Sequence, residues 1–331
     1  MLCHICPDLI VNDSTVVSYR LTNLKLPLDH DPSDLRSEVL SILSLQDVDL
    51  LNLHVFRRGY DARKKSNIHF IYTVDLQFSA EVDISFLISK CHLQITPDME
   101  YKPVFSAIKG NSYTNTPGYK RPVVVGTGPC GLFAALTLAQ LGLRPLVIER
   151  GKAVRERTKD TWGFWRKQIF NQESNVQFGE GGAGTFSDGK LWTQAKDRRH
   201  LGRKVMEEMV KGGAPEEILY VSKPHVGTFR LVKIVEYLRS EIERLGGEIR
   251  FSSRVENIVV EAGGIRGLET LNMISGERSE IDANQVVLAV GHSARDTFEM
   301  LHSRGVFVEP KPFSIGFRIE HPQGVIDRAR F

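Results

Sequence analysis

The feature that most constrains this chain is a glycine turn that directly follows a short β-branched run. Residues 123–125 are all Val, and Gly126, Gly128 and Gly131 follow at GxGxxG spacing, with Pro129 and Cys130 completing the turn. In such a turn the first glycine permits the bend, the second lets a pyrophosphate approach the backbone, and the third lets the next helix pack closely. The unpaired N–H groups at the start of that helix favour an anion. The stretch therefore predicts a dinucleotide-binding strand-turn-helix.

An acidic residue stands where a ribose ligand is expected. Glu149 follows a second apolar strand, residues 146–148, and no basic residue takes its place. A carboxylate at this position binds ribose hydroxyl groups. We therefore expect an unphosphorylated ribose, as in FAD or NAD, and we expect Cys130 to be a small packed residue rather than a reactive thiol.

Composition excludes several classes of protein. The chain has 331 residues, 41% hydrophobic residues and a net charge of +3, which is too small a basic excess to indicate nucleic acid or an anionic membrane. No apolar stretch reaches the roughly 18 residues of a membrane span. The amino end lacks the basic leader and apolar core of a secretory signal. We predict a soluble, cytoplasmic protein with no membrane partner, and a plastid or another organelle as the alternative.

Four cysteines are too few for a disulfide scaffold, which fits a reducing compartment. Cys3 and Cys6 have CxxC spacing, but no second pair accompanies them. Because a zinc site needs about four ligands, we interpret them as free thiols and predict no metal site.

The first 110 residues are interpreted as a small α+β domain. Strands are expected at 19–26, 48–57 and 68–78, and helices at 32–45, with Ser33 as N-cap, and at 81–90. Strand, helix, strand, strand, helix is the order of a ferredoxin-like sandwich. Residues 57–65 are expected to form a basic connection. It would be solvated or touch phosphate, face the cofactor domain or, as a weaker hypothesis, bind RNA; nucleic acid is an unlikely partner because no aromatic RNA-binding string is present.

The second half is expected to contain a cofactor domain at 121–310, after a polar linker at 111–120. Residues 175–192 are unusually rich in glycine, including Gly181 and Gly182, and are bounded by aromatic residues. We expect their N–H groups to face a cofactor ring or pyrophosphate. A three-stranded meander is expected from Val255 to residue 281, and a further strand ends at Gly291, where close approach to a cofactor is again possible. Ser293 and Asp296 form a plausible capping pair for a helix at 294–303.

The basic stretch that starts at Arg150 has two interpretations. An arginine from it would pair with pyrophosphate oxygens in a bidentate fork. Alternatively, the spacing of the apolar residues in 150–165 indicates a helix whose basic residues form its solvated face.

These features together resemble the glutathione-reductase-like flavoproteins, which contain two dinucleotide folds. The resemblance lies in GTGPCG…ER at 126–150, in the meander, and in LAVGH at 288–292. A closer resemblance is to a family of poorly characterised FAD-dependent dehydrogenases, also called FAD/NAD(P)-binding oxidoreductases. It is carried by RRGYDARKK at 57–65, NVQFGEGGAGTFSDGKL at 175–191 and FSIGFRIEHPQ at 313–323. The resemblance implies that residues 311–331 are the start of a truncated substrate domain.

We therefore expect an α/β protein with a Rossmann-like FAD-binding domain and a β-meander, and an FAD-dependent oxidoreductase of unknown substrate. FAD would lie with its pyrophosphate over the glycine turn, its adenosine ribose on Glu149 and its adenine near Val255. The partners would be a small-molecule substrate and NAD(P)H or another electron donor. No acid/base pair indicates a catalytic residue. The alternatives are an NAD(P)-binding enzyme without flavin, and a non-catalytic nucleotide- or RNA-binding module.

Overall fold

The computed structural model describes residues 17–64, 66–193, 195–312, 315–317 and 319–330. The CxxC pair at Cys3 and Cys6 lies outside these residues, as does part of the string at 313–323. Two compact units can be distinguished, one extending to Met99 and including residues 219–222 and 324–331, the other comprising residues 100–218 and 223–323.

The first unit is a four-stranded antiparallel sheet with two helices. Its strands lie in the order β2-β3-β1-β4, the order of a ferredoxin-like sandwich, which confirms the predicted fold of this region. The elements, in chain order, are β1 (Tyr19–Pro27), α1 (Pro32–Leu43), β2 (Leu50–Asp61), β3 (His69–Phe78), α2 (Ile84–Cys91) and β4 (Gln94–Ile95). β4 was not predicted from the sequence.

The helix α1 packs on this sheet through a stripe of apolar residues. Leu35, Val39 and Leu43 are buried at intervals of four residues, which is the spacing of one helix face. The predicted N-cap, Ser33, is wrong: Asp31 is the N-cap, because Pro32 occupies the first helical position, where its missing N–H costs nothing.

The predicted basic connection at 57–65 is mostly strand. β2 continues to Asp61, and Arg57 and Arg58 are paired with Thr73 and Tyr72 of β3. The backbone N–H of Arg58 also donates to Tyr220 O at 2.7 Å. Strand pairing therefore fixes the backbone of this basic segment.

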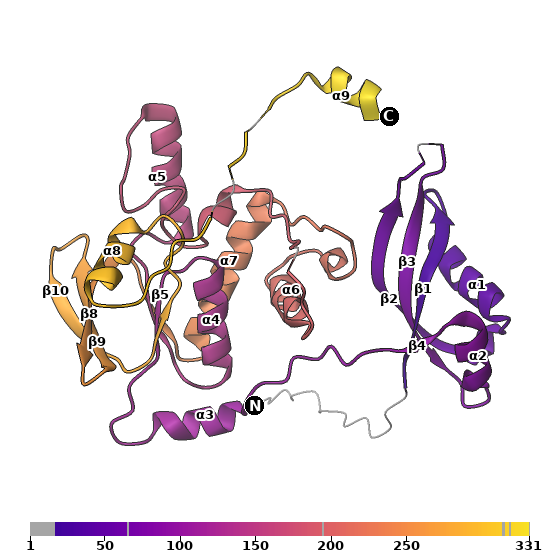
Figure 1. Ribbon diagram of the computed structural model, residues 1–331, viewed down its shortest axis with the longest axis horizontal. Coiled ribbons are helices and arrows are strands. Elements are labelled where there is room, and N and C mark those ends of the chain that lie inside the picture. The colour runs from indigo at the N-terminus through magenta and orange to yellow at the C-terminus, as the bar shows by residue number, and fades with distance from the viewer. Residues whose placement is uncertain (1–16, 65, 194, 313–314, 318, 331) are drawn as a thin grey trace, which may run out of the picture. The chain divides into compact units, whose positions relative to one another are not determined.

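The second unit is built on a parallel sheet in the order β11-β5-β6-β7 (Figure 1). Its strands are β5 (Val123–Val125), β6 (Leu146–Ile148), β7 (Glu248–Arg250) and β11 (Val286–Leu288). The helix α4 (Pro129–Gln140) packs against α7 (Thr228–Arg244), and both lie beside the sheet. The β-branched run at 123–125 is the second strand of this sheet and is buried, as expected for a strand covered on both faces.

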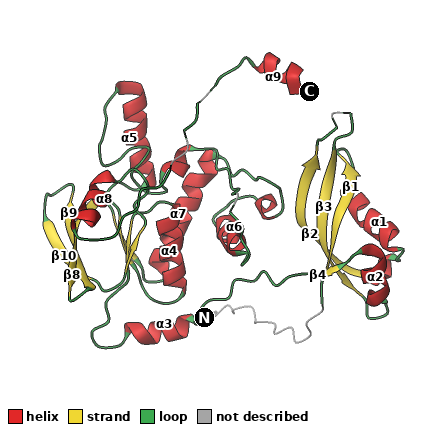
Figure 2. Ribbon diagram, in the orientation of Figure 1, coloured by secondary structure: helices red, strands yellow, loops and turns green. Residues whose placement is uncertain are grey.

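A second, antiparallel sheet forms the meander, which Figure 2 shows in yellow beside the helix α8 (Arg295–Ser303). The strands β8 (Ser253–Glu261), β9 (Gly264–Asn272) and β10 (Arg278–Asp282) lie in the order β10-β9-β8. The apolar side chains of the two sheets share one core, in which Val123, Ile148 and Ile258 are buried. The Rossmann-like domain with a meander is thereby confirmed.

Further helices complete the second unit. They are α3 (Ala107–Thr114), α5 (Val154–Lys167), α6 (Leu201–Lys211) and α8 (Arg295–Ser303). The last helix, α9 (Gln323–Arg330), belongs almost entirely to the first unit. α3 begins after Ser106, which caps it by accepting a hydrogen bond from Lys109 N at 3.4 Å, and it extends into the polar segment 111–120. Residues 111–114 of the predicted linker therefore form the last turn of a helix.

Candidate functional site

The three glycines of the turn differ in whether the packing of the chain explains them. Gly126 has a φ of +99°, and a Cβ there would lie 2.4 Å from Ala289 O of the neighbouring strand end. A Cβ at Gly131 would lie 1.9 Å from Gly126 O, so helix α4 can approach the turn only without a side chain. At Gly128 the nearest described atom is Gly182 Cα, at 4.0 Å. Packing thus explains Gly126 and Gly131, whereas the position at Gly128 is open.

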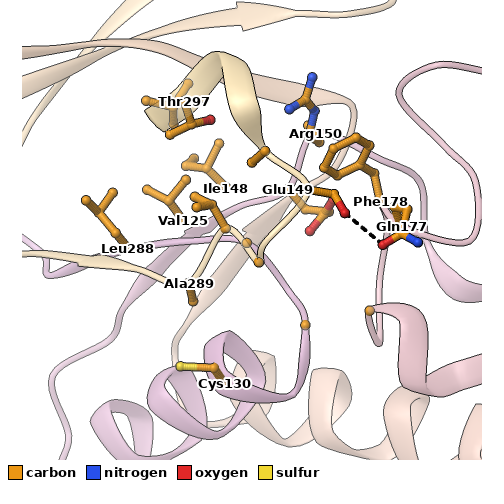
Figure 3. A pocket seen from close by; sticks show the side chains of 18 of the residues that line it. Val125, Cys130, Ile148, Glu149, Arg150, Gln177, Phe178, Leu288, Ala289 and Thr297 are labelled. Atoms are coloured by element: carbon orange, nitrogen blue, oxygen red, sulfur yellow. Dashed lines mark hydrogen bonds between the residues drawn. The ribbon is translucent and has the colours of Figure 1, made fainter. Parts of the chain in front are cut away.

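Helix α4 begins directly at this opening. Gly128 is its N-cap and Pro129 its first residue, and Cys130 follows as an exposed free thiol in the first turn (Figure 3). The N–H groups of a first helical turn have no partner within the helix, and the helix dipole is positive there. The turn therefore presents a site for a negatively charged group.

Glu149 is buried and holds the glycine turn in place. Its Oε2 accepts hydrogen bonds from Thr127 N at 2.8 Å and from Thr127 Oγ1 at 2.7 Å, and its Oε1 accepts from Gly151 N at 2.8 Å. An ionised carboxylate offers about four acceptor positions. Three are used by the chain itself, which leaves about one for a ligand hydroxyl group.

The glycine-rich segment that follows α5 lies against the same turn. Gly181 N donates to Thr127 O at 2.9 Å, and a Cβ at Gly182 would lie 3.1 Å from Gly128 Cα. Both residues have positive φ, at +85° and +63°. A Cβ at Gly181 would lie 2.1 Å from Thr185 Oγ1, so Gly181 is explained by packing. We call residues 175–186 the glycine loop.

A cavity of about 480 Å³ opens between the glycine turn, the glycine loop and the meander. Figure 3 shows apolar side chains on one side of it, among them Val125, Ile148 and Leu288, and Arg150 and Phe178 on another. Nine of the residues predicted from the sequence line this cavity: Gly126, Gly128, Pro129, Cys130, Glu149, Arg150, Gly182, Val255 and Gly291. Gly131 and Gly181 are not among the lining residues and lie behind them.

Val255 reaches the cavity from the meander, and Gly291 reaches it from the segment that follows the parallel-sheet strand β11. Val255, at the start of β8, is 7% exposed and presents an apolar surface. Gly291 follows β11 and has a φ of +75°, and a Cβ there would have no described atom within 4 Å. A side chain at Gly291 would therefore be limited by backbone strain rather than by space.

Arg150 lines the cavity, but two carboxylates already hold its guanidinium group. Nε donates to Glu173 at 2.7 Å, and the two terminal nitrogens donate to Asp296 at 3.0 and 2.9 Å. The guanidinium carbon also lies 4.2 Å from the centre of the Phe178 ring. These partners raise the pKa of Arg150. The bidentate fork predicted for a pyrophosphate is made to Asp296 in this structure.

The basic stretch after Glu149 is neither wholly a solvated face nor a phosphate clamp. Arg155 is solvent-exposed and pairs with Glu236 of α7 at 2.8 Å, as a solvated helix face predicts. Arg157, two residues on, is completely buried. Its nitrogens donate to the carbonyl oxygens of Asn175, Val176, Glu180 and Gly182 at 2.7–2.8 Å. Burial lowers the pKa of Arg157 to about 10.

Two polar residues of the cavity were not predicted as ligand contacts. Gln177 of the glycine loop accepts a hydrogen bond from Ser293 Oγ at 2.9 Å, drawn as a dashed line in Figure 3. The predicted capping pair of Ser293 and Asp296 is wrong, because Ala294 is the N-cap of α8 and Asp296 binds Arg150. For Gln177 and Ser293, the only sign of a ligand contact in the sequence was a polar side chain in a loop near the edge of the sheet.

Neither a metal cluster nor a membrane-spanning helix is found among the described residues. No group of three or more His, Cys, Asp or Glu side chains within the described ranges is arranged to hold a metal ion. None of the helices in those ranges has the length and apolarity that crossing a bilayer requires.

Two family models match the sequence. Residues 120–311 match the pyridine nucleotide-disulphide oxidoreductase family, and residues 18–77 match a domain of unknown function. An uncharacterized protein of Clostridium beijerinckii is 42% identical over 311 residues, which cover 94% of this chain and 56% of that protein. The chain thus spans little more than half the length of this relative.

Solved structures with a similar fold are more distant. THI4 of Thermovibrio ammonificans is 19% identical, with 60% of this chain and 65% of that chain covered and a TM-score of 0.36. The 3-ketosteroid-Δ4-(5α)-dehydrogenase of Rhodococcus jostii RHA1 is 16% identical, with 58% and 50% covered and a TM-score of 0.35.

Proposed function

The chain belongs to the pyridine nucleotide-disulphide oxidoreductase family, whose members are FAD-dependent oxidoreductases, and we propose that the cavity beside its glycine turn binds FAD. The pyrophosphate would lie over Gly126, Gly128 and the first turn of α4. The adenosine ribose would donate a hydroxyl hydrogen bond to Glu149, and the adenine would pack near Val255. We propose a small-molecule substrate for the oxidoreductase activity.

The observation that carries this proposal is the open position at Gly128. A side chain there would meet no described protein atom closer than 4.0 Å and would project into the cavity. The absence of a side chain is therefore explained by the close approach of a ligand to the backbone and not by packing within the chain. The fit is supported by Glu149, which retains about one acceptor position, and by the apolar surface of Val255.

The chemistry would be divided between cofactor and protein. FAD supplies hydride transfer when bound, and the protein binds and orients it. The first turn of α4 offers N–H groups and a positive dipole end to the pyrophosphate. Glu149 orients the ribose, and the apolar side chains of Val125, Ile148 and Leu288 exclude water from one wall of the cavity. We assign no catalytic acid or base.

The partners and the domain layout are part of the same proposal. An oxidoreductase requires an electron partner, for which we propose NAD(P)H or another electron donor. The modest net charge of +3 supports a protein without a nucleic-acid partner, and the low cysteine content supports a cytoplasmic location. We also propose the division into a ferredoxin-like domain at 1–110, a linker at 111–120, an FAD-binding domain at 121–310 and the start of a substrate domain at 311–331.

The test is a titration of the flavin-free protein with FAD, in which binding is measured as the change in flavin fluorescence. The unsubstituted protein should bind FAD saturably, and Gly128→Ala should weaken binding without lowering the melting temperature. The matched control is Gly184→Ala, a glycine of the same site region that also has no described atom within 4 Å of its Cβ position but does not line the cavity. Equal affinity of all three proteins, or no saturable binding by any of them, would contradict the proposal. Preference for NAD(P)H over FAD would favour the enzyme without flavin.

A further inference from the structure

Arg157 does not touch the cavity, yet it contacts most of the glycine loop from within. Its four hydrogen bonds reach carbonyl groups between Asn175, the first residue of the loop, and Gly182. A Cβ at Gly179 would lie 2.4 Å from Arg157 Cδ, so the loop backbone rests directly on the arginine side chain. The ring of Phe186 lies 4.8 Å from the guanidinium carbon. The loop is thus wrapped around a single side chain.

Hydrogen bonds continue from the loop to the residues proposed to hold FAD. Arg157 holds the carbonyl groups of Glu180 and Gly182, and the N–H of Gly181 between them donates to Thr127 O at 2.9 Å. Thr127 in turn donates both its N–H and its hydroxyl group to Glu149. An unbroken series of contacts therefore joins the buried guanidinium group to the carboxylate at the cavity.

From these contacts we propose that Arg157 is a positioning residue for cofactor binding. It holds the glycine loop against the glycine turn, and so fixes the place of Gly182 beside Gly128 and the orientation of Glu149. This inference rests on the proposed function, since it concerns the site at which FAD would bind. Arg157 acts through the loop and has no contact with the cavity.

The chemistry of arginine suits this role in a way that other side chains do not. A planar guanidinium group presents five N–H donors in a fixed fork, and four of the loop carbonyl groups are satisfied at once. Lysine keeps the positive charge but places its three donors on one nitrogen, whereas Arg157 uses Nε, Nη1 and Nη2 for different carbonyl groups. A buried carbonyl group that loses its donor pays the cost of desolvation.

The experiment compares the full-length protein with Arg157→Lys and with Arg155→Lys. Arg155 lies on the same helix, is solvent-exposed and pairs with Glu236. Its substitution therefore makes the same chemical change at a residue that does not contact the glycine loop. Each protein is measured in three ways: FAD affinity of the flavin-free form, amide hydrogen exchange without FAD, and the melting temperature.

Arg157→Lys should weaken FAD binding by about tenfold or more, because at least one charge-assisted hydrogen bond is lost. Amide exchange should accelerate in residues 175–186 and at Thr127, while α7 and the meander keep their protection. Arg155→Lys should match the unsubstituted protein in all three measurements.

Three results would overturn the inference. They are unchanged FAD affinity in Arg157→Lys, faster exchange spread evenly over the second unit, and loss of the cooperative melt, because the last two would mean that Arg157 supports the whole fold rather than the loop. If the unsubstituted protein binds no FAD, the proposed function fails instead. The exchange measurement, made without FAD, then still decides whether Arg157 holds the loop on the turn.

Discussion

Glu180 should make the second unit less stable as the pH rises from 5 to 8. Its side chain is completely buried, and its Oε2 accepts hydrogen bonds from Val154 N at 2.7 Å and from Arg239 at 3.0 Å. Its Oε1 has no hydrogen-bond partner among the described residues. Burial raises the pKa of this carboxyl group from 4.5 to about 7. The protonated form is therefore favoured by folding.

The sign and size of the effect follow from this difference. Between pH 4.5 and 7 the folded protein keeps a proton on Glu180 that the unfolded chain has lost, so the stabilisation is fully present below pH 4.5 and disappears as the pH rises through 7. At about 1.4 kcal/mol per pKa unit, the free energy of unfolding falls by about 2.5 kcal/mol between pH 5 and 8. For a unit of this size, the melting temperature should fall by roughly 5–10 °C over the same interval.

The assay is the melting temperature of the full-length protein and of Glu180→Gln at half-unit steps of pH. Glutamine cannot lose a proton, so this part of the decline should be absent from the variant. The control is Glu241→Gln on α7: the hydrogen bond and ion pair with Arg244 lower the pKa of Glu241, so its contribution is lost only as the pH falls below the ordinary carboxyl range. Parallel curves for the unsubstituted protein and Glu180→Gln would refute the reasoning.

Three further substitutions test interactions inside each unit. Gly131→Ala should destabilise the second unit by about 1–3 kcal/mol, because its Cβ would lie 1.9 Å from Gly126 O, and calorimetry should show a lower melting temperature. Thr127→Val removes the hydroxyl donor to Glu149 and should cost about 1.5–3 kcal/mol in urea unfolding, the value expected for a hydrogen bond to a charged group; an unchanged midpoint would show that the bond contributes nothing. Leu76→Ala in the ferredoxin-like core, where Leu76 has no exposed surface, should cost about 2–5 kcal/mol, and hydrogen exchange should rise in β1 and β3 but not in β5.

Regular periodicity made much of the fold predictable. The valine run before Gly126 could only be a buried strand, and the apolar stripe of α1 has the spacing of one helix face. β4 was missed because two residues are too few to show any period. The basic charge of residues 57–65 suggested a connection, but β2 continues beyond the predicted strand end at Arg57 to Asp61, because strand pairing depends on the partner strand and not on local charge.

The site was predictable where a residue type is required by its backbone conformation. Gly126 and Gly182 have positive φ, and this requirement is visible as glycine in the sequence. The role of Arg157 was not visible. Its partners are main-chain carbonyl groups, which exist at every position and leave no mark on the sequence, and its neighbours Arg155 and Lys159 have the pattern of a solvated helix face.

The structure changes the weight of the evidence for a dinucleotide. In the sequence, the acid at Glu149 is the strongest sign of a ribose ligand. In the structure, three donors of the chain itself converge on its carboxylate, and a glutamine would place an N–H group against one of them, so the acid is required even without a ligand. For Gly128 the sequence evidence is weak, because it is the second glycine of a common spacing. In the structure, however, no described protein atom explains the missing side chain. The substitution that discriminates between a cofactor site and a folded remnant is therefore at Gly128 and not at Glu149, because a side chain at Gly128 leaves the packing of the protein unaltered, whereas a change at Glu149 removes hydrogen bonds within the chain.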